Sequence, residues 1–506
     1  MVPLERRLKP VSVRTDAPRL ADVAGMIRFF LPMSLHLAAR GLSLALALFV
    51  PLRLGAAPDR TPLSLATLDQ VPTLAERIGR IERFVHERYY DADGLMYSHW
   101  NWREERPFVP ADFQATDSTM MGPEPHAWMS YENSSFISGL FLAAQCFRYQ
   151  ATRDPVALEY AQRAFHSLDV NYRLTERHDP SQVGPNQRAG IVDSVPAART
   201  PQNGFFCKPY YGQATDHTST EQHFGPLFGL YHYFKLAPPA TQQRIKQMFS
   251  EVSRRWRTAY RINFFGEVWN LEESYPRAQR HMFTWAVMHR LAFEITGEPE
   301  CLEEFKRLDA LYGALPTPRE TSIGLGRPRY ISTEDRSFHV QIVMGAELLA
   351  QLEPAQRDRY LRGMRGWWEY SLIGQREDLA SYYFIRVDAL TGAWEKLPTS
   401  IKPRAHWRSS YLMQNATLPI CWLGTRERQG LTSAILIRNR AGESEAPQRR
   451  LRAVFASVTK DHLRWFTDPE GVMPKELHWM LNVLQGDSLA FHTLGYWYAR
   501  AHGIEL

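Results

Sequence analysis

Residues 135–147 read Ser-Phe-Ile-Ser-Gly-Leu-Phe-Leu-Ala-Ala-Gln-Cys-Phe, a stretch that is apolar or small on nearly every side of a helix. A helix without a polar face must be surrounded by protein on all sides. Other stretches have the same character, and we expect each to form a buried inner helix. The six inner helices are predicted to start near residues 132, 220, 279, 335, 407 and 486, and the fifth includes the apolar run from Tyr411 to Trp422.

Amphipathic stretches alternate with the buried ones. In residues 245–256 the apolar side chains recur at helical spacing, with Gln, Arg and Lys between them. A helix of this kind buries one face and exposes the other. We expect six such outer helices, over about 74–90, 154–171, 240–259, 299–313, 354–371 and 449–466.

This alternation predicts two concentric rings of helices. Because one helix hairpin cannot bury its own apolar surface, the rings must close together as one unit. The expected fold is therefore all-α: an (α/α)6 barrel, or six-hairpin toroid, in a single large domain over residues 58–506. The length of 506 residues alone would also allow two to four domains.

The composition is that of a globular protein, with 44% hydrophobic and 23% charged residues. It excludes a disordered, collagenous or disulfide-scaffold chain. Eight Lys or Arg and three acidic residues lie within the first 57 residues, so most of the formal net charge of +6 is found there. The remaining body is nearly neutral, which argues against a nucleic-acid partner.

The first 57 residues have the organisation of a secretory signal. Arg40 precedes an apolar run over 42–52, and small residues follow up to Ala57. The run is too short for a comfortable membrane span, and Met26 or Met33 would be a better start for such a signal. We expect a periplasmic or secreted protein, cleaved near Ala57, without stable membrane insertion afterwards. An uncleaved membrane anchor is the alternative.

The links between the predicted helices are asymmetric. Those from an inner to an outer helix are short, as at Glu353-Pro354, and the link after Trp422 is an exception. Those from an outer to an inner helix are long, and long structured loops usually carry function. We therefore expect the site where the inner helices begin. Their free N–H groups and positive dipole ends favour anionic or hydroxyl-rich ligands.

Ionisable and aromatic residues gather at these helix starts. Trp and Tyr beside carboxylates and Arg are the components of a sugar site, and cleavage of a glycosidic bond needs a carboxylic acid and a second carboxylate. We expect Asp216 and Glu221 to be this pair, with His217, Glu132 and His281 orienting or tuning them. The predicted substrate-binding residues are Trp269, Glu272, Arg277, Arg336, His339, Arg404, Trp407, Arg408 and Trp479.

Each of these residues also has a purely structural interpretation. Asp216 could be a helix N-cap, and Glu221 could be the acid of a capping box. His281 and His339 could be hydrogen-bonded core histidines. Asp216 and its neighbours lack a recognised zinc spacing, and the four cysteines suggest no pairing. We expect neither a metal nor a cofactor.

The chain resembles the six-hairpin glycosidase superfamily over about residues 74–503. Besides the alternating helices, the resemblance rests on Tyr131-Glu-Asn-Ser-Ser-Phe-Ile-Ser-Gly-Leu-Phe141 and Ser219-Thr-Glu-Gln-His-Phe-Gly-Pro-Leu-Phe-Gly-Leu230. Within the superfamily the chain is similar to uronic-acid-acting hydrolases, such as unsaturated glucuronyl hydrolases and β-glucuronidases. The resemblance implies a catalytic acid at the start of the second inner helix, where Glu221 stands in place of the usual Asp, and a uronate held by cations such as the predicted arginines.

The expected function is an exported glycoside hydrolase that acts on an acidic, uronic-acid-containing oligo- or polysaccharide. One alternative is a polysaccharide lyase, in which a Tyr or His removes the proton next to the uronate carboxylate. Others are a sugar epimerase with paired histidines and a non-catalytic glycan-binding toroid. The bases considered for the lyase are Tyr211, Tyr275, Tyr330 and His339.

Overall fold

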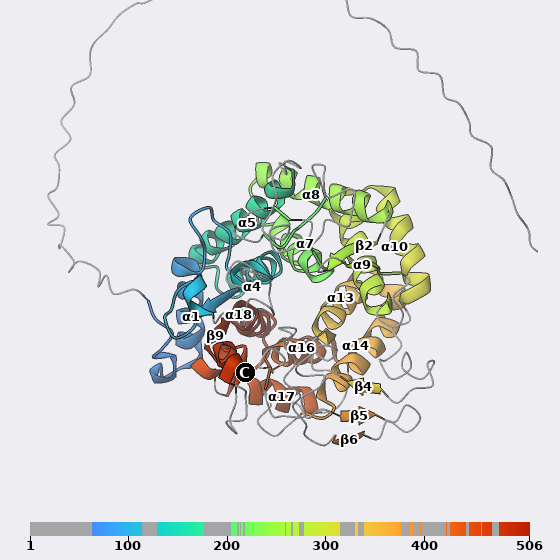
Figure 1. The fold of residues 1–506 in the computed structure, drawn as a ribbon. Helices are drawn as coiled ribbons and strands as arrows, with labels where there is room; N and C mark the ends of the chain where they lie inside the picture. Colours follow the sequence, from blue (N-terminus) through green and yellow to red (C-terminus); the bar gives the residue numbers. More distant parts are fainter. Residues whose placement is uncertain are drawn as a thin grey trace, which may run out of the picture. The chain divides into compact units, whose positions relative to one another are not determined.

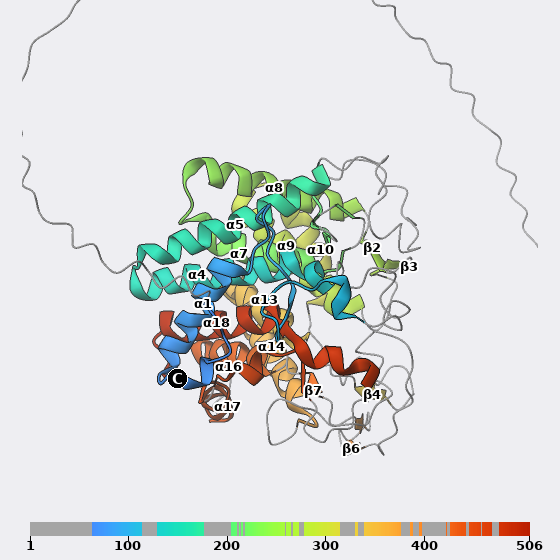
Figure 2. The ribbon, with the colours of Figure 1, turned by 60° about the vertical axis from the view of Figure 1, so that its left-hand side comes forward.

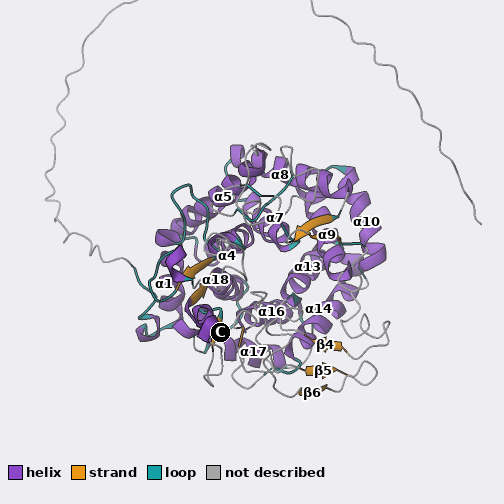
Figure 3. Cartoon of the chain, viewed as in Figure 1, coloured by secondary structure: helices purple, strands orange, loops and turns teal. Residues whose placement is uncertain are grey.

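The computed structural model divides the chain into two units, Met1–Thr61 and Pro62–Leu506. Everything described below belongs to the second unit, which is largely helical (Figure 3). The structure describes residues 63–113, 129–176, 204–209, 212, 214–215, 218–258, 260–264, 267–272, 278–313, 329–331, 338–375, 385–387, 394–396, 421–422, 426–441, 445–456, 458–467 and 475–506.

Six inner helices form a closed ring, which Figure 1 shows from one end. Each helix contacts the next one along the chain, and the last returns to the first. They are α4 (Ser134–Thr152), α7 (Glu221–Phe234), α9 (Ala278–Thr296), α13 (His339–Leu352), α16 (Arg426–Asn439) and α18 (Gly486–Ala501).

Six outer helices surround this ring. Five of them contact the inner helix that precedes them in the chain, and the first contacts α18. This arrangement confirms the all-α (α/α)6 barrel. The outer helices are α1 (Leu74–Arg88), α5 (Pro155–Glu176), α8 (Pro239–Thr258), α10 (Pro299–Tyr312), α14 (Arg357–Leu372) and α17 (Ala446–Phe455).

Local sequence explains both kinds of helix. Helix α1 begins with a capping box between Thr73 and Glu76, and its buried face includes Ile78 and Phe84. Helix α4, in contrast, is buried on all sides from Ser134 to Phe147. It also lies very close to α7: a Cβ atom added to Gly139 would be 2.1 Å from the backbone of α7. Only a residue without a side chain permits this approach.

The prediction for the fifth inner helix is wrong. Residues Cys421–Trp422 form a strand, β7, and the helix begins at Arg426. The first turn of α16 reads Arg-Glu-Arg-Gln, and all four residues are buried. These polar side chains can be buried because they have polar partners inside the protein. The first turn of α16 is therefore buried without an apolar pattern in its sequence. The link from α16 to α17 spans 440–445 and is as short as its counterparts, so the predicted exception is also wrong.

The outer helix predicted over 449–466 is only partly correct. Helix α17 ends at Phe455, and a short 3-10 helix, η7 (Lys460–Leu463), follows. Other 3-10 segments are η1 (Leu68–Gln70), η2 (Pro110–Asp112), η5 (Pro354–Gln356) and η8 (Lys475–Asn482).

Short antiparallel strands lie in the long links that lead into the inner helices. In Figure 2, β2, β3, β4 and β6 lie at one end of the helices, and the C-terminus lies at the other. The pairs are β1 (His99–Asn101) with β9 (Val483–Gln485), β2 (Arg261–Phe264) with β3 (Glu267–Asn270), β5 (Ile385–Val387) with both β4 (Arg329–Ile331) and β6 (Trp394–Lys396), and β7 with β8 (Phe466–Thr467).

Candidate functional site

Polar side chains join the first turns of the inner helices to one another. Gln222 at the start of α7 donates to Asn133 Oδ1 at 2.9 Å, just before α4, and Ser135 Oγ donates to Gln222 Oε1 at 2.5 Å. Thr220 Oγ1 lies 2.8 Å from Nδ1 of His281 on α9. These bonds hold the beginnings of α4, α7 and α9 together. We call this end of the ring the mouth.

The carboxyl group of Glu132 is the central feature of the mouth. It immediately precedes α4, its side chain is 16% exposed, and its Oε1 lies 3.2 Å from Nζ of Lys208, which is buried. Burial raises the pKa of Glu132; Lys208 opposes that rise, and the negative charge of Glu221 on α7 adds to it. Glu132 is therefore biased towards its proton-bearing form, beside a second carboxylate.

The segment that carries Lys208 is held against α5 and α7. Asn171 of α5 donates to the carbonyl of Cys207 at 3.1 Å, and Thr215 Oγ1 donates to the carbonyl of Lys208 at 2.7 Å. The N–H of Phe206 donates to Nε2 of His223 at 3.2 Å. Bonds on several sides therefore fix the backbone of the segment that places Lys208 beside Glu132.

A second ion pair lies close to the first. Nη2 of Arg428 on α16 donates to Oδ2 of Asp487 on α18 at 2.6 Å, and both side chains are buried. Burial raises the pKa of Asp487, Arg428 and His99 oppose the rise, and the charge of Glu132 adds to it. The charge of Glu132 thus acts on Asp487. Within the described chain, Oδ1 of Asp487 has no hydrogen-bond partner.

Glu427 is a third buried carboxyl group in this region. Burial raises its pKa to about 7, although the neighbouring Arg428 opposes the rise. Ser488 Oγ donates to its Oε1 at 3.2 Å, whereas no described residue bonds its Oε2. A buried acceptor without a partner is costly, and this oxygen and Oδ1 of Asp487 are two such acceptors among the described residues.

An aromatic cluster flanks these acids. His99, whose pKa burial lowers to about 4, has Nδ1 within 3.0 Å of the carbonyl of Met129. Its ring lies 5.1 Å from that of Trp465, which lies 6.4 Å from that of Trp479. Trp479 also packs against Phe113 at 5.3 Å. Most of its surface is therefore engaged by protein.

The structure brings part of the predicted site together. Glu132, Glu221 and His281 lie at the mouth, and His339 begins α13, with its Nε2 3.1 Å from Thr432 Oγ1. Glu272 forms an ion pair at 3.0 Å with Arg307 of the outer helix α10. Trp269 lies in β3, and its side chain is outside the description. The predicted residues outside the described ranges are Asp216, His217, Arg277, Arg336, Arg404, Trp407 and Arg408.

Several residues of the mouth were not predicted from the sequence: Lys208, Arg428, Asp487, Glu427 and His99. Asp487 could have been noticed, since it is an acid at the start of a predicted inner helix. Lys208 and Arg428 carry no such indication, because their partners lie 76 and 59 residues away in the chain.

Among the described residues, no cluster of three or more His, Cys, Asp or Glu side chains could hold a metal ion. None of the described helices is both long and apolar enough to cross a membrane.

No protein-family model matches this chain, and no curated protein matches it in sequence. Solved structures do resemble it. A sugar epimerase from a ruminal bacterium is 10% identical, with a TM-score of 0.49, and the match covers 86% of this chain and 100% of the epimerase. A polysaccharide lyase is 10% identical, with a TM-score of 0.39 over 72% of this chain and 90% of the lyase.

An unsaturated glucuronyl hydrolase specific for heparin is 9% identical, with a TM-score of 0.36 over 74% of this chain and 99% of the hydrolase. The closed ring of inner helices, surrounded by outer helices, is the (α/α)6 barrel expected from the sequence. The chemistry of this chain is inferred from its own residues.

Proposed function

We propose that this protein is a carbohydrate-active enzyme that hydrolyses a glycosidic bond at the mouth of the ring. The observation that carries the proposal is the pair formed by Glu132, just before α4, and Glu221, the first residue of α7. The first is a carboxyl group whose pKa is raised by burial, and the second is near enough for its charge to raise that pKa further. Glycosidic hydrolysis needs a proton donor and a second carboxylate of this kind.

In this scheme Glu132 gives its proton to the oxygen of the leaving sugar as the carbon–oxygen bond breaks. Glu221 accepts a proton from the water that forms the new bond to the sugar carbon. The reaction adds one water molecule per bond cleaved. Lys208 acts as a positioning residue, since its ammonium group holds Oε1 of Glu132 at 3.2 Å.

We further propose that the substrate is a saccharide that contains uronic acid. We also propose that the enzyme is exported. The six inner helices have their N-termini at or near the mouth. The positive dipole of a helix N-terminus favours anions. The arginines predicted from the sequence to bind a carboxylate, Arg277, Arg336, Arg404 and Arg408, would add positive charge.

A second candidate is epimerisation of a sugar. It is favoured by His281 and His339, which lie in the first turns of the neighbouring helices α9 and α13. Each has one ring nitrogen within hydrogen-bond distance of a threonine hydroxyl, at 2.8 and 3.1 Å. A histidine fixed in this way can remove or deliver a proton at a defined position.

The test is incubation of the full chain with uronate-containing and neutral oligosaccharides in heavy water, followed by mass spectrometry and ultraviolet absorbance. A gain of one water per cleavage supports hydrolysis. New absorbance from an unsaturated uronate would indicate a lyase. Deuterium on an uncleaved sugar would indicate an epimerase.

The acid is assigned by substitution. Glu132→Gln retains the shape of the protonated carboxyl group but cannot release a proton. We expect its rate to fall by about 10²–10⁴-fold, the usual contribution of general acid–base catalysis. The protein should stay folded, with a lower unfolding temperature because the buried Lys208 loses its carboxylate partner. Glu221→Gln should show a similar loss of rate. Asp216→Asn tests the acid predicted from the sequence, and Glu303→Gln on the exposed face of α10 is the control. Near wild-type hydrolysis by Glu132→Gln would refute the assignment.

A further inference from the structure

A pocket of about 380 Å³ has a lining that includes none of the acids of the mouth. Three segments form it: 64–66 before η1, 102–105 after β1, and Lys460 at the start of η7. The pocket is connected to the barrel through the backbone, because the N–H of Trp102 donates to the carbonyl of Asn482 at 2.6 Å. Its volume is at the lower end of the roughly 300–1,000 Å³ typical of small-molecule sites.

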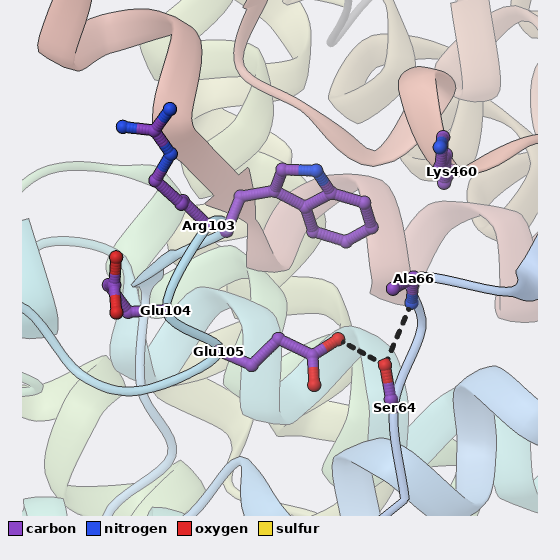
Figure 4. A pocket seen from close by; sticks show the side chains of 7 residues that line it. Ser64, Ala66, Arg103, Glu104, Glu105 and Lys460 are labelled. Carbon is purple, nitrogen blue, oxygen red and sulfur yellow. Dashed lines mark hydrogen bonds between the residues drawn. The ribbon is translucent and has the colours of Figure 1, made fainter.

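One wall of the pocket is rigid and electrically neutral. Glu105, at a left-handed φ of 44°, accepts hydrogen bonds from Ser64 Oγ at 2.6 Å and from the N–H of Leu65 at 3.1 Å. Arg88 donates to both its carboxylate and its carbonyl, at 3.2 and 2.7 Å. Figure 4 shows Glu105 directed at Ser64. This carboxylate is fully engaged and is not available to a ligand.

The position of Lys460 is fixed by its backbone, while its side chain remains available. Its N–H donates to Asp69 Oδ1 at 2.7 Å. Within the described residues, the ammonium group of Lys460 and the guanidinium group of Arg103 have no hydrogen bond or ion pair. Glu104, the remaining acid of the pocket, interacts with Arg106. The pocket therefore contains two uncompensated cations, which Figure 4 shows on different sides.

Trp102 supplies an aromatic surface to the pocket. It is only half-buried, with part of its side chain packed against the core. None of the described aromatic rings stacks on it, and its indole N–H has no partner among the described residues. An exposed indole offers a face for the apolar side of a sugar ring and a donor for a hydroxyl group.

We infer that this pocket is a second saccharide-binding site, which takes a sugar unit that carries a carboxylate. Trp102 covers the apolar face of the ring, Lys460 binds the carboxylate, and Arg103 and Glu104 form hydrogen bonds with hydroxyl groups. The ligand class rests on the proposed function, whereas the existence of the site does not. A site outside the mouth would hold a chain that the mouth cleaves, and so would affect long substrates more than short ones.

The test is calorimetric titration of the full chain carrying Glu132→Gln, which prevents turnover. The probes are a hexuronate tetramer and the same tetramer with its carboxyl groups reduced to alcohols. We expect two binding events for the hexuronate. Trp102→Ala or Lys460→Gln, added to this background, should weaken one event by about tenfold or more. Lys306→Gln, on the exposed face of α10, is the control and should change neither event.

Several results would overturn the inference. One is that neither Trp102→Ala nor Lys460→Gln changes binding. Another is equal affinity for the reduced tetramer, which would show that the cations recognise nothing. A third is competition by inorganic phosphate as strong as that by the hexuronate, which would make the pocket a general anion site. If Trp102→Ala lowers the unfolding temperature, Trp102→Phe, which retains an aromatic face, and Lys460→Gln decide the matter.

The two proposals fail separately. If full hydrolysis persists in Glu132→Gln while Lys460→Gln loses one binding event, the proposed chemistry is wrong and the pocket stands. If Glu132→Gln abolishes hydrolysis while the pocket variants bind normally, the second site is wrong and the chemistry stands. In otherwise wild-type protein, Lys460→Gln should leave the hydrolysis of short substrates unchanged.

Discussion

Both ends of the helix ring contain buried carboxyl groups with raised pKa values, but these groups have more hydrogen-bond donors at one end than at the other. At the far end, Oε1 of Glu347 on α13 accepts hydrogen bonds from Arg438 at 2.8 Å, from Asn439 at 3.1 Å and from Tyr498. Glu82 on α1 is similarly surrounded, with Gln145 at 2.6 Å and Trp497 at 2.7 Å on Oε1 and Arg148 at 3.3 Å on Oε2.

At the mouth the acids have fewer donors. Lys208 contacts Glu132, and single oxygens of Asp487 and Glu427 have no partner among the described residues. A carboxyl group whose donors are all supplied by protein joins helices, whereas one with unused acceptor capacity can receive a ligand. The carboxyl groups of the far end thus join helices, whereas those of the mouth lie where we propose that the reaction takes place.

The most direct test of this difference is to remove one acid from each end and compare the losses of stability. Glu347→Ala leaves Arg438 and the donors of Tyr498 and Asn439 without their acceptor, so the free energy of unfolding should fall by about 3–5 kcal/mol. Glu221→Ala removes a half-buried side chain at a helix start and should cost at most about 1 kcal/mol. Urea unfolding measures both. Equal losses would show that the mouth is as structural as the far end.

The pH dependence of stability sharpens the same contrast. Burial raises the pKa of Glu82 from 4.5 to about 7, so the folded protein holds this proton more tightly than the unfolded chain. The stabilisation by this proton is present below the unfolded pKa and is lost as the pH rises towards 7. Glu82→Gln has no such loss. Its free energy of unfolding, relative to that of the wild type, should therefore increase by about 3 kcal/mol between about pH 4.5 and pH 7.

Unfolding in urea at about pH 5 and about pH 8 checks this prediction. The matched variant at the far end is Gln145→Leu, which removes the 2.6 Å bond to Glu82 but no titrating group. A constant offset between Glu82→Gln and wild type at both pH values would contradict the assigned pKa.

The smallest expected effect is at Thr220. Thr220→Val removes the hydroxyl group that lies 2.8 Å from Nδ1 of His281, and the cost in stability should be about 1 kcal/mol. Because the bond orients an imidazole at the mouth, the turnover rate should fall clearly even though the free energy of unfolding changes little. Thr493→Val in α18 is the control, since its hydroxyl group donates to the carbonyl of Leu489 in its own helix at 2.7 Å. Equal effects on turnover would remove the positioning role of Thr220.

The fold could be predicted from the sequence wherever burial appears as apolar periodicity. Helix α4 is apolar on every side, and its character is plain over 135–147. Helix α16 shows the limit, because its first turn is polar and yet buried. Gln429 donates to the carbonyl of Ser371, 58 residues earlier, and Arg428 to Asp487. A pattern within one helix cannot reveal partners that only the closed ring supplies.

The candidate site was predictable to the same extent. Glu132 and Glu221 are acids at predicted helix starts, and the structure places both at the mouth. Burial by neighbouring helices raises the pKa of Glu132 and the ammonium group of Lys208 opposes the rise, and neither influence is visible in the local sequence. Helix starts can therefore be found by inspection, while the electrostatic role of each acid requires the tertiary structure.

The contact between α18 and α4 has a consequence for the order of events during synthesis. These helices lie at opposite ends of the described chain, so the ring stays open until the last inner helix has been made. Until then, the flanks of α4 and α16 that α18 covers face water. Such late, long-range closure is slow and leaves the nascent chain exposed to aggregation. Chaperones that recognise apolar surface would find their target in this open ring, and the same two flanks would accept α18 from another copy of the chain.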